Sequence, residues 1–234
     1  MTSVLVLRVC TAIIAGYLLG SIPSGVLVGK LFGNRDPRDY GSRKTGATNV
    51  LRTIGPGAAA LVTLLDVGKG AAAVLLARVL LSFPEGTHVF AAYGTSWQAI
   101  AGALAALAAL LGHNYSVFIG FKGGRGVLTG AGAVLVMDWV AWLVGFIAAA
   151  TPIALTRYVS LGSILGATAC PIAGFVLMLT GHDNLPQVIF MALGGAFIIV
   201  SHADNIKRLL NGTERKLGQP AEGGNPAPSA APER

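Results

Sequence analysis

Long apolar runs alternate with short polar connections along most of the chain. The runs lie at about 4–30, 57–82, 89–111, 126–137, 139–156, 159–180 and 186–203. A helix needs about 20 mainly apolar residues to cross the hydrocarbon core of a bilayer, so the pattern predicts a set of membrane-spanning helices. The run 126–137 is short and rich in glycine, and only Asp138 separates it from the next run. The favoured count is seven spans, and six is the alternative.

The composition places the chain in the membrane class. Of its 234 residues, 53% are hydrophobic and 12% are charged, whereas soluble domains carry about 25% charged residues. We therefore expect an all-α fold, a polytopic integral membrane helical bundle that forms one domain over residues 1–216. Residues 217–234 are rich in proline, alanine and glycine and predict a disordered tail. Cys10 and Cys170 lie in apolar runs, which favours small buried side chains over a disulfide.

Lysine and arginine occur in alternate connections between the apolar runs. They lie around 31–56, 122–125 and 157 and in the segment after 203, but not around 84–86, 138 or 181–184. Cytoplasmic loops of membrane proteins are enriched in these two residues, so the pattern predicts an N-terminus outside and a C-terminus in the cytoplasm. The glycine-rich cationic loops then share the cytoplasmic face. A six-span count would put part of this charge pattern out of phase.

The first cationic loop has the residue types of a phosphate-binding segment. Its two glycines allow backbone conformations that bring N–H groups close to a ligand, and its short polar side chains add hydrogen-bond donors. Its last arginine lies three and four residues after polar positions, so one helical turn places them on one face. Arginine binds phosphate oxygens through two parallel hydrogen bonds. The candidate ligand-binding residues of this loop are Gly41, Ser42, Gly46, Thr48, Asn49 and Arg52.

The second glycine-rich loop precedes the fourth apolar run and repeats this composition. Free N–H groups at a helix start, together with the helix dipole and two cations, make an anion site. The segment lacks the G-x-x-x-x-G-K-[ST] pattern of a nucleotide-binding P-loop. A histidine before it is a candidate base or phosphate donor near neutral pH, although a histidine satisfied by backbone is an equal alternative. The candidates are His113, Lys122, Gly123, Gly124 and Arg125.

Four polar residues lie in or beside other apolar runs. Asp66 and Lys69 are three residues apart within the second run, so they are neighbours on one helical face. Ionisable groups inside a membrane are costly and usually face the bundle interior. An internal ion pair is the simpler interpretation, and contact with a substrate is the alternative. Ser160, beside Arg157, and Asn205, beside Lys207, are further candidate binding residues.

Several function classes lack their sequence signatures. The chain has no H-x-x-x-x-D acyltransferase motif, no G-x-S-x-G elbow, no histidine and carboxylate cluster suited to a catalytic metal, and no aromatic-rich nucleic-acid surface. We therefore expect no metal and no nucleic acid. A transporter for anionic solutes stays open as an alternative, although it predicts paired repeats that we do not find. A lipid-binding scaffold without catalytic activity is the other alternative.

Six ordered motifs resemble those of the bacterial acyl-phosphate:glycerol-3-phosphate acyltransferase family, called PlsY, over residues about 16–217. They are Gly20-Ser21-Ile22-Pro23-Ser24-Gly25; Gly41-Ser42 with Gly46-Ala47-Thr48-Asn49 and Arg52; Leu65-Asp66 with Lys69-Gly70; Gly112-His113-Asn114 with Phe121-Lys122-Gly123-Gly124-Arg125-Gly126; Ser160-Leu161 with Ser163; and His202 with Asn205-Ile206, Arg208 and Gly212-Thr213-Glu214. The family usually has Gly-Ser-Gly-Asn where this chain has Gly41-Ser42-Arg43-Lys44. Two neutral positions of the motif are therefore cations here.

The resemblance implies a seven-span enzyme of the bacterial cell membrane with its active site facing the cytoplasm. The implied reaction moves a fatty acyl group from acyl phosphate to the 1-hydroxyl of glycerol 3-phosphate, which gives lysophosphatidic acid and phosphate. Acyl-CoA and acyl carrier protein are not direct donors in this family. No metal or organic cofactor is expected, and membrane lipid and a functional link to an enzyme that produces acyl phosphate are implied.

The matched motif positions assign the phosphate and substrate site to Ser42, Arg52, Lys122, Ser160 and Asn205. Charge suggests how they act: cations stabilise the leaving phosphate, while loop N–H groups or the serine hydroxyl hold the oxyanion. The attacking hydroxyl needs a proton acceptor, either His113 or a phosphate oxygen of the substrate. We do not favour a covalent acyl-serine, because no histidine is adjacent in sequence.

Overall fold

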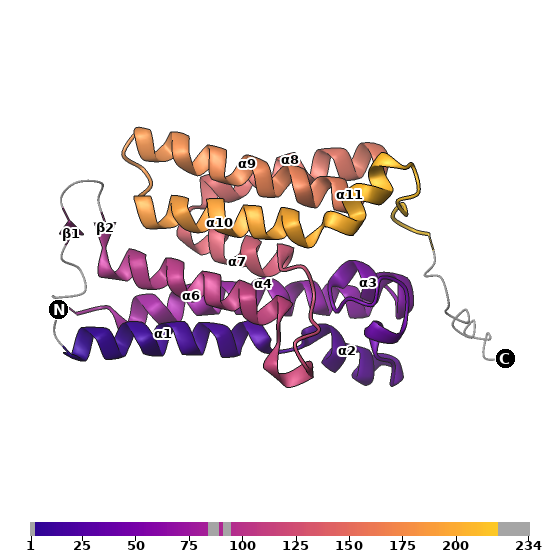
Figure 1. Ribbon diagram of the computed structural model, residues 1–234, viewed down its shortest axis with the longest axis horizontal. Helices are drawn as coiled ribbons and strands as arrows, with labels where there is room; N and C mark the ends of the chain where they lie inside the picture. Colours follow the sequence, from indigo (N-terminus) through magenta and orange to yellow (C-terminus); the bar gives the residue numbers. More distant parts are fainter. Residues whose placement is uncertain (1–2, 84–88, 91–94, 220–234) are drawn as a thin grey trace.

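The computed structural model describes residues 3–83, 89–90 and 95–219 as a bundle of long helices that run side by side (Figure 1). The elements are α1 (Ser3–Ser21), α2 (Ser24–Gly33), η1 (Pro37–Asp39), α3 (Ala47–Thr53), α4 (Pro56–Leu80), β1 (Val89–Phe90), β2 (Thr95–Ser96), α6 (Trp97–Asn114), η2 (Val117–Ile119), α7 (Val127–Met137), α8 (Trp139–Thr156), α9 (Val159–Leu179), α10 (Leu185–Ser201) and α11 (Ala203–Leu210). The two short strands pair antiparallel. This confirms the predicted all-α class.

Five of the described helical segments are long and apolar enough to cross a membrane: Ser3–Gly33, α4, α6 as part of Trp97–Ile119, α8 and α9. A sixth is added if α10 and α11, which meet at a bend of 58°, count as one span. With 11 residues, α7 is about 16 Å long, roughly half of the hydrocarbon thickness. This helix is too short to cross the hydrocarbon core alone. Seven spans therefore stays a prediction.

The helices form two groups that are stacked on each other in Figure 1. Helices α1, α4, α6 and α7 pack together, and α8, α9 and α10 form the second group; α10 against α6, and α7 against α8, join the two. Large apolar side chains cover the outside, among them Leu64 at 68% exposed and Leu155 at 79%, as expected where lipid is the solvent.

Glycine lets α1 and α6 approach almost backbone to backbone. A Cβ atom at Gly16 or Gly20 would overlap the carbonyl groups of Ala105 or Ala109. Small residues allow this close packing of membrane helices, and the contacted positions of α6 are alanines. This close packing against α1 holds α6 in position, and His113 lies in the last turn of α6.

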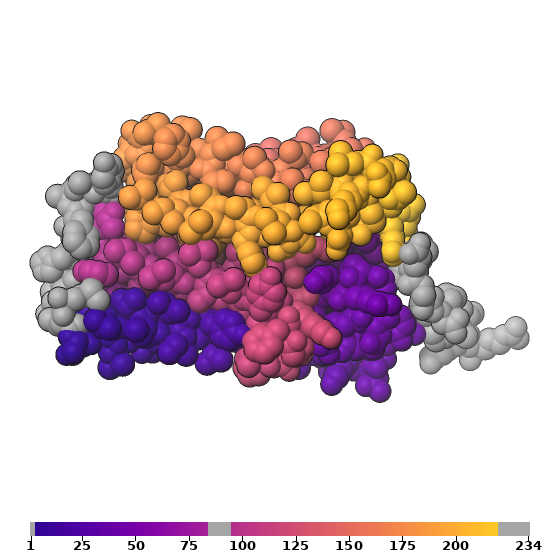
Figure 2. All heavy atoms as spheres, in the orientation of Figure 1, coloured from indigo at the N-terminus to yellow at the C-terminus, as the bar shows by residue number. Residues whose placement is uncertain are grey.

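The loops that carry lysine and arginine gather at one end of the bundle. Arg38 donates from Nη1 to the carbonyl oxygen of Ile119 at 3.1 Å, which joins the first and second cationic loops. Arg157, between α8 and α9, donates to the carbonyl oxygen of Leu217. Figure 2 shows the segment after α10 beside the early part of the chain at this end. The gathering confirms the sequence pattern, while the cytoplasmic assignment of this end stays a prediction.

Neither of the two cysteines is in a disulfide. Cys170 is partly buried as expected, but the expected burial of Cys10 is wrong, because this residue lies on an exposed face of α1. Of the predicted tail, 217–219 are described and 220–234 lie outside the described residues.

Candidate active site

A cavity of about 780 Å³ opens at the cation-rich end and extends between the helices. Its walls come from the first cationic loop with α3, from α4, from α6 to α11, and from the segment after α11. Polar residues line one part: Gly41, Ser42, Arg43, Lys44, Gly46, Thr48, Asn49, Arg52, Asp66, His113, Arg125, Ser160, His202, Asp204, Asn205, Arg208, Glu214 and Arg215. Apolar and small residues line the other part. The cavity therefore has a charged region that continues into an apolar one.

Asn49 gives the first loop its shape. Its Nδ2 donates to the carbonyl oxygens of Pro37 (2.7 Å), Lys44 (2.9 Å) and Tyr40 (3.2 Å). Its Oδ1 accepts the backbone N–H of Ser42 at 3.0 Å. These bonds hold the loop around the Asn49 side chain, which is buried. Asn49 therefore shapes the loop through the Ser42 N–H, and Ser42 itself lines the cavity.

Arg52 is presented to the cavity from α3. Its Nη2 donates to the carbonyl oxygen of Arg215 at 3.1 Å, while its buried Nε has no hydrogen-bond partner among the described residues. Burial, and then the neighbouring charge of Arg215, lower the pKa of this guanidinium. An anion in the cavity would relieve both effects, since an opposite charge favours the charged form.

Five more cations line the same region: Arg43, Lys44, Arg125, Arg208 and Arg215. Arg125 donates from Nε to the carbonyl oxygen of Ser201 at 3.1 Å, and burial, followed by the charge of Arg208, lowers its pKa. Burial and then the charge of Arg125 lower the pKa of Lys44 in the same way. Clustered, partly desolvated cations of this kind make an anion-binding site.

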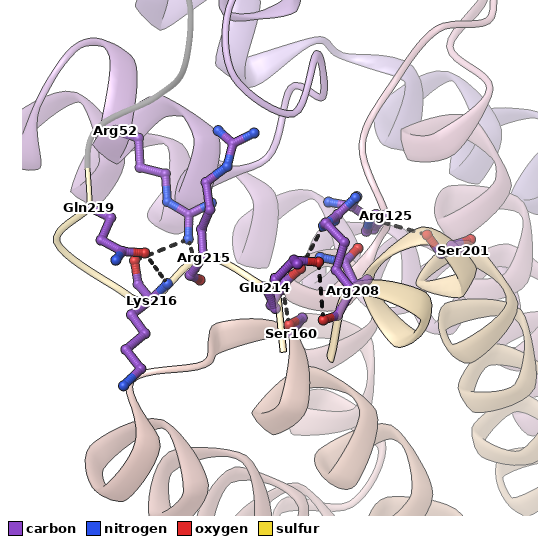
Figure 3. Close-up of polar contacts among 11 residues, drawn as sticks. Arg52, Arg125, Ser160, Ser201, Arg208, Glu214, Arg215, Lys216 and Gln219 are labelled. Atoms are coloured by element: carbon purple, nitrogen blue, oxygen red, sulfur yellow. Dashed lines mark hydrogen bonds and ion pairs between the residues drawn. The ribbon is translucent and has the colours of Figure 1, made fainter. Parts of the chain in front are cut away.

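Glu214 is the acidic centre of this cation cluster. Its Oε1 accepts hydrogen bonds from Ser160 Oγ at 2.8 Å and from Asn205 Nδ2 at 2.7 Å, and its Oε2 pairs with Arg208 Nε at 2.7 Å. These contacts hold the segment after α11 against α9 (Figure 3). The Ser160 hydroxyl therefore bonds to this segment rather than to the backbone of its own helix.

A cluster of buried ionisable side chains lies at the contact between α4 and α6, beside the cavity. Lys69 Nζ lies 2.8 Å from Asp66 Oδ1 and donates to the carbonyl oxygen of Ile22 at 3.1 Å. His113 Nδ1 lies 3.2 Å from the hydroxyl of Thr129. The predicted internal ion pair is therefore present. Asp66 and His113 also reach the cavity.

The second glycine-rich loop packs against His113. Gly124 donates its N–H to the carbonyl oxygen of His113 at 3.1 Å, and Gly123 donates to that of Asn114 at 3.0 Å. A Cβ atom at Gly124 would overlap Nε2 of His113. These N–H groups serve the protein backbone, so the expected anion site at Gly123 and Gly124 is not formed by them. Lys122 is exposed and outside the cavity wall.

The apolar part of the cavity lies between α7, α8, α9 and α10. Trp142 stacks on Phe146 with ring centroids 5.2 Å apart, and Phe190, only 1% exposed, closes the wall from α10. The lining continues from Ser160 to Cys170 along α9, a distance of about 15 Å at the helical rise. An apolar chain attached to a phosphate group fits this division of the cavity.

Ten of the site residues predicted from the sequence line the cavity: Gly41, Ser42, Gly46, Thr48, Asn49, Arg52, His113, Arg125, Ser160 and Asn205. The sequence had not assigned roles to Arg208, Glu214 or Arg215. The motif that ends in Glu214 was the available signal for that segment. The apolar lining had no signal, because its residues resemble any lipid-facing helix.

Among the described residues, no three histidine, cysteine, aspartate or glutamate side chains are grouped as metal ligands. The polar groups that line the cavity are cations, carboxylates, hydroxyls, amides and imidazoles. Such groups bind anions, orient hydroxyls and stabilise negative charge that develops during a reaction.

A family model described as glycerol-3-phosphate acyltransferase matches residues 10–212 of this chain. Glycerol-3-phosphate acyltransferases of a Synechococcus species and of Thermus thermophilus are 45% and 44% identical over 208 and 210 residues. The alignments cover 89% of this chain and 93% of the first relative, and 90% and 96% for the second.

Two crystal structures of PlsY (YgiH), an integral membrane glycerol 3-phosphate acyltransferase, have a similar fold. The glycerol 3-phosphate form has a TM-score of 0.75 and 36% identity, covering 90% of this chain and 96% of that chain. The lysophosphatidic acid form has a TM-score of 0.73 and 35% identity, covering 90% and 95%.

Proposed function

Because this chain belongs to the glycerol-3-phosphate acyltransferase family, we propose that it transfers a fatty acyl group from acyl phosphate to the 1-hydroxyl of glycerol 3-phosphate. The products are lysophosphatidic acid and inorganic phosphate. One observation carries this proposal: a single cavity joins a cluster of cations and hydroxyls to an apolar interior. An acyl phosphate has the same division between a charged group and an apolar chain.

The cation cluster accounts for the phosphate groups of both substrates. Arg52 and Arg125 are partly desolvated, so an anion that pairs with them gains more than it would in bulk water. Bidentate hydrogen bonds from arginine match the geometry of phosphate oxygens. The PlsY crystals in glycerol 3-phosphate and lysophosphatidic acid forms support a site that accepts a polyol phosphate and its acylated product.

Acyl transfer needs a nucleophile, a stabilised oxyanion and a leaving group. The 1-hydroxyl oxygen attacks the carbonyl carbon, and the bond from that carbon to the phosphate oxygen breaks, so phosphate leaves with the electron pair. Arg52 and Arg125, joined by Lys122 from the rim, stabilise the departing charge, and the Ser42 hydroxyl donates to the oxyanion. Because acyl phosphate is already activated, alignment of the two substrates supplies much of the acceleration.

The hydroxyl proton goes to a phosphate oxygen of the substrate in this proposal. His113 also lines the cavity, but its Nδ1 lies next to Thr129 and its Nε2 packs against Gly124. Both ring nitrogens therefore have neighbours within the wall. His113 then acts by holding the second loop in place.

We also propose that the cation-rich end faces the cytoplasm of a bacterial cell and that the chain crosses the plasma membrane seven times. The positive-inside rule supports the orientation. The half-length helix α7, shielded by α4 and α8, counts as the fourth of these spans. A functional link to an enzyme that produces acyl phosphate follows from the donor.

The proposal is tested by release of phosphate from palmitoyl phosphate by the purified protein in detergent. We expect release to require glycerol 3-phosphate and to equal the lysophosphatidic acid formed. Release at the same rate without glycerol 3-phosphate would reject the transferase reaction. Binding of both compounds without turnover would favour a lipid-binding scaffold instead.

A further inference from the structure

The Glu214 carboxylate accepts hydrogen bonds from three residues of the cavity wall. It lies in the segment after α11, and only 6% of its side chain is exposed. Ser160 on α9, Asn205 on α11 and Arg208 on α11 all donate to it. Figure 3 shows Glu214 between Ser160 and Arg208, with Arg125 nearby.

An ionised carboxylate can only accept hydrogen bonds, which fixes the direction of each contact. The single hydroxyl hydrogen of Ser160 is used by Glu214, so Ser160 has only lone pairs left. The Asn205 amide must turn its Nδ2 toward Glu214, which leaves Oδ1 on the other edge of the amide. That oxygen is buried and has no hydrogen-bond partner among the described residues.

Glu214 keeps its charge in this environment. Burial alone would raise the pKa of this carboxyl group, but the hydrogen bonds from Asn205, Ser160 and Arg208 outweigh burial and hold the pKa below its ordinary value. A protonated Glu214 would instead offer a donor to its neighbours. The acceptor character of the Ser160 and Asn205 edge therefore persists at neutral pH.

We infer that Glu214 is a positioning residue that makes the Ser160–Asn205 edge an acceptor surface, and that this surface selects the acceptor substrate by a hydroxyl of its glycerol moiety. The inference rests on the proposed function. A phosphate oxygen brings lone pairs and negative charge, so it is repelled by this edge and goes to the arginines. A hydroxyl can donate its hydrogen to Asn205 Oδ1. This contact is favourable because a buried acceptor without a hydrogen bond destabilises the protein.

The test compares binding of glycerol 3-phosphate with that of propyl phosphate, which has the same phosphate group but no hydroxyl. Both are measured on the purified full-length protein as inhibition constants or by calorimetry, without the acyl donor. The ratio of the two affinities cancels changes in phosphate binding alone. This matters because any loss of the Glu214 charge leaves the cation cluster more positive.

For the wild type we expect glycerol 3-phosphate to bind about 3- to 10-fold more tightly, the value of one net hydrogen bond. Glu214→Gln and Asn205→Leu should both bring the ratio close to one. Gln219→Ala is the matched control from the same segment, because Gln219 contacts Lys216 at an exposed position, and it should keep the wild-type ratio. Melting temperatures in detergent check that each variant is folded.

A wild-type ratio near one, or a preserved ratio in both variants, would overturn the inference. A Glu214→Gln protein with the full preference and tighter binding of both ligands would also overturn it, because Glu214 would then only occupy a phosphate position. These outcomes differ from failure of the proposed function, in which wild-type protein forms no lysophosphatidic acid from acyl phosphate. Single-hydroxyl analogues, 2-hydroxypropyl and 3-hydroxypropyl phosphate, then identify which hydroxyl carries the preference.

Discussion

Oδ1 of Asp66 and Nδ1 of His113 lie 3.6 Å apart where α4 and α6 meet at the cavity wall. The same carboxylate oxygen pairs with Lys69, whose Nζ also reaches the break between α1 and α2 through Ile22. Asp66 is 1% exposed. One buried charge therefore ties three helical segments together and supports the histidine that contacts the second loop.

Replacement of Asp66 by asparagine should strongly destabilise the bundle. Lys69 would lose its partner while it stays buried, and removal of one member of a buried pair costs about 3–5 kcal/mol. The melting temperature in detergent measures this loss, with Asp39→Asn, at an exposed position, as the control. The double variant Asp66→Asn/Lys69→Met should recover part of the loss. A single variant as stable as the wild type would contradict this account of the cluster.

Arg52 and Lys122 should both contribute to turnover, but to different extents. Arg52→Ala should lower kcat/KM for phosphate release by about 10²- to 10³-fold, the usual effect of losing a group that stabilises developing charge. Lys122 is exposed outside the cavity wall, so it must turn inward to act, and Lys122→Ala should cost at least tenfold.

Salt dependence distinguishes the two cations. Lys122 is exposed, so its contribution should weaken at high ionic strength more than that of the partly buried Arg52. Lys122→Arg, which keeps the charge, is the matched control and should recover much of the rate. Rates close to wild type in both Arg52→Ala and Lys122→Ala would refute the phosphate-site assignment.

Arg43 has a left-handed backbone conformation, with φ at +54°. The family motif described above usually has glycine at this position. A non-glycine residue in this conformation costs about 1–2 kcal/mol. Arg43→Gly should therefore raise the melting temperature relative to Arg43→Ala, which removes the same charge but keeps the strain. Both should bind inorganic phosphate more weakly than wild type, because the cavity loses one cation. Equal stability of the two variants would show that the backbone strain is absent.

Gly194 on α10 lines the apolar part of the cavity and has room for one methyl group, with the nearest atom, Leu110 Cδ2, 3.4 Å from the added Cβ. Gly194→Ala should narrow the space for the acyl chain and lower kcat/KM for palmitoyl phosphate relative to octanoyl phosphate by about tenfold, as expected for one methylene in an apolar pocket. Gly68→Ala, with open space around it, is the control. An unchanged ratio would place the acyl chain elsewhere.

The charge pattern of the sequence predicted where the loops meet, because lysine and arginine are excluded from lipid and must gather at water boundaries. The family motifs predicted Ser160 and Asn205 as site residues on separate helices. The number of spans was harder to predict from the sequence. Helix α7 is as apolar as its neighbours, but its length is only about half of the hydrocarbon thickness. Apolar content does not distinguish a helix that crosses the membrane from one shielded within the bundle.

The contacts of Glu214 could not be predicted from residue types. A glutamate after a helix, next to several cations, usually indicates a solvated surface. Its role depends on the turn after α11, which brings it back to α9, 54 residues earlier in the chain. In the same way, the N–H groups of Gly123 and Gly124 matched an anion site by composition, but the close packing of His113 gives them backbone partners.

The identity of the acyl donor tests the central claim most directly. Purified protein is given labelled glycerol 3-phosphate with palmitoyl phosphate or with palmitoyl-CoA, and lysophosphatidic acid is quantified. We predict rapid formation from palmitoyl phosphate, with an equal amount of released phosphate, and none above background from palmitoyl-CoA. Formation from palmitoyl-CoA alone would contradict the assignment of acyl phosphate as the donor.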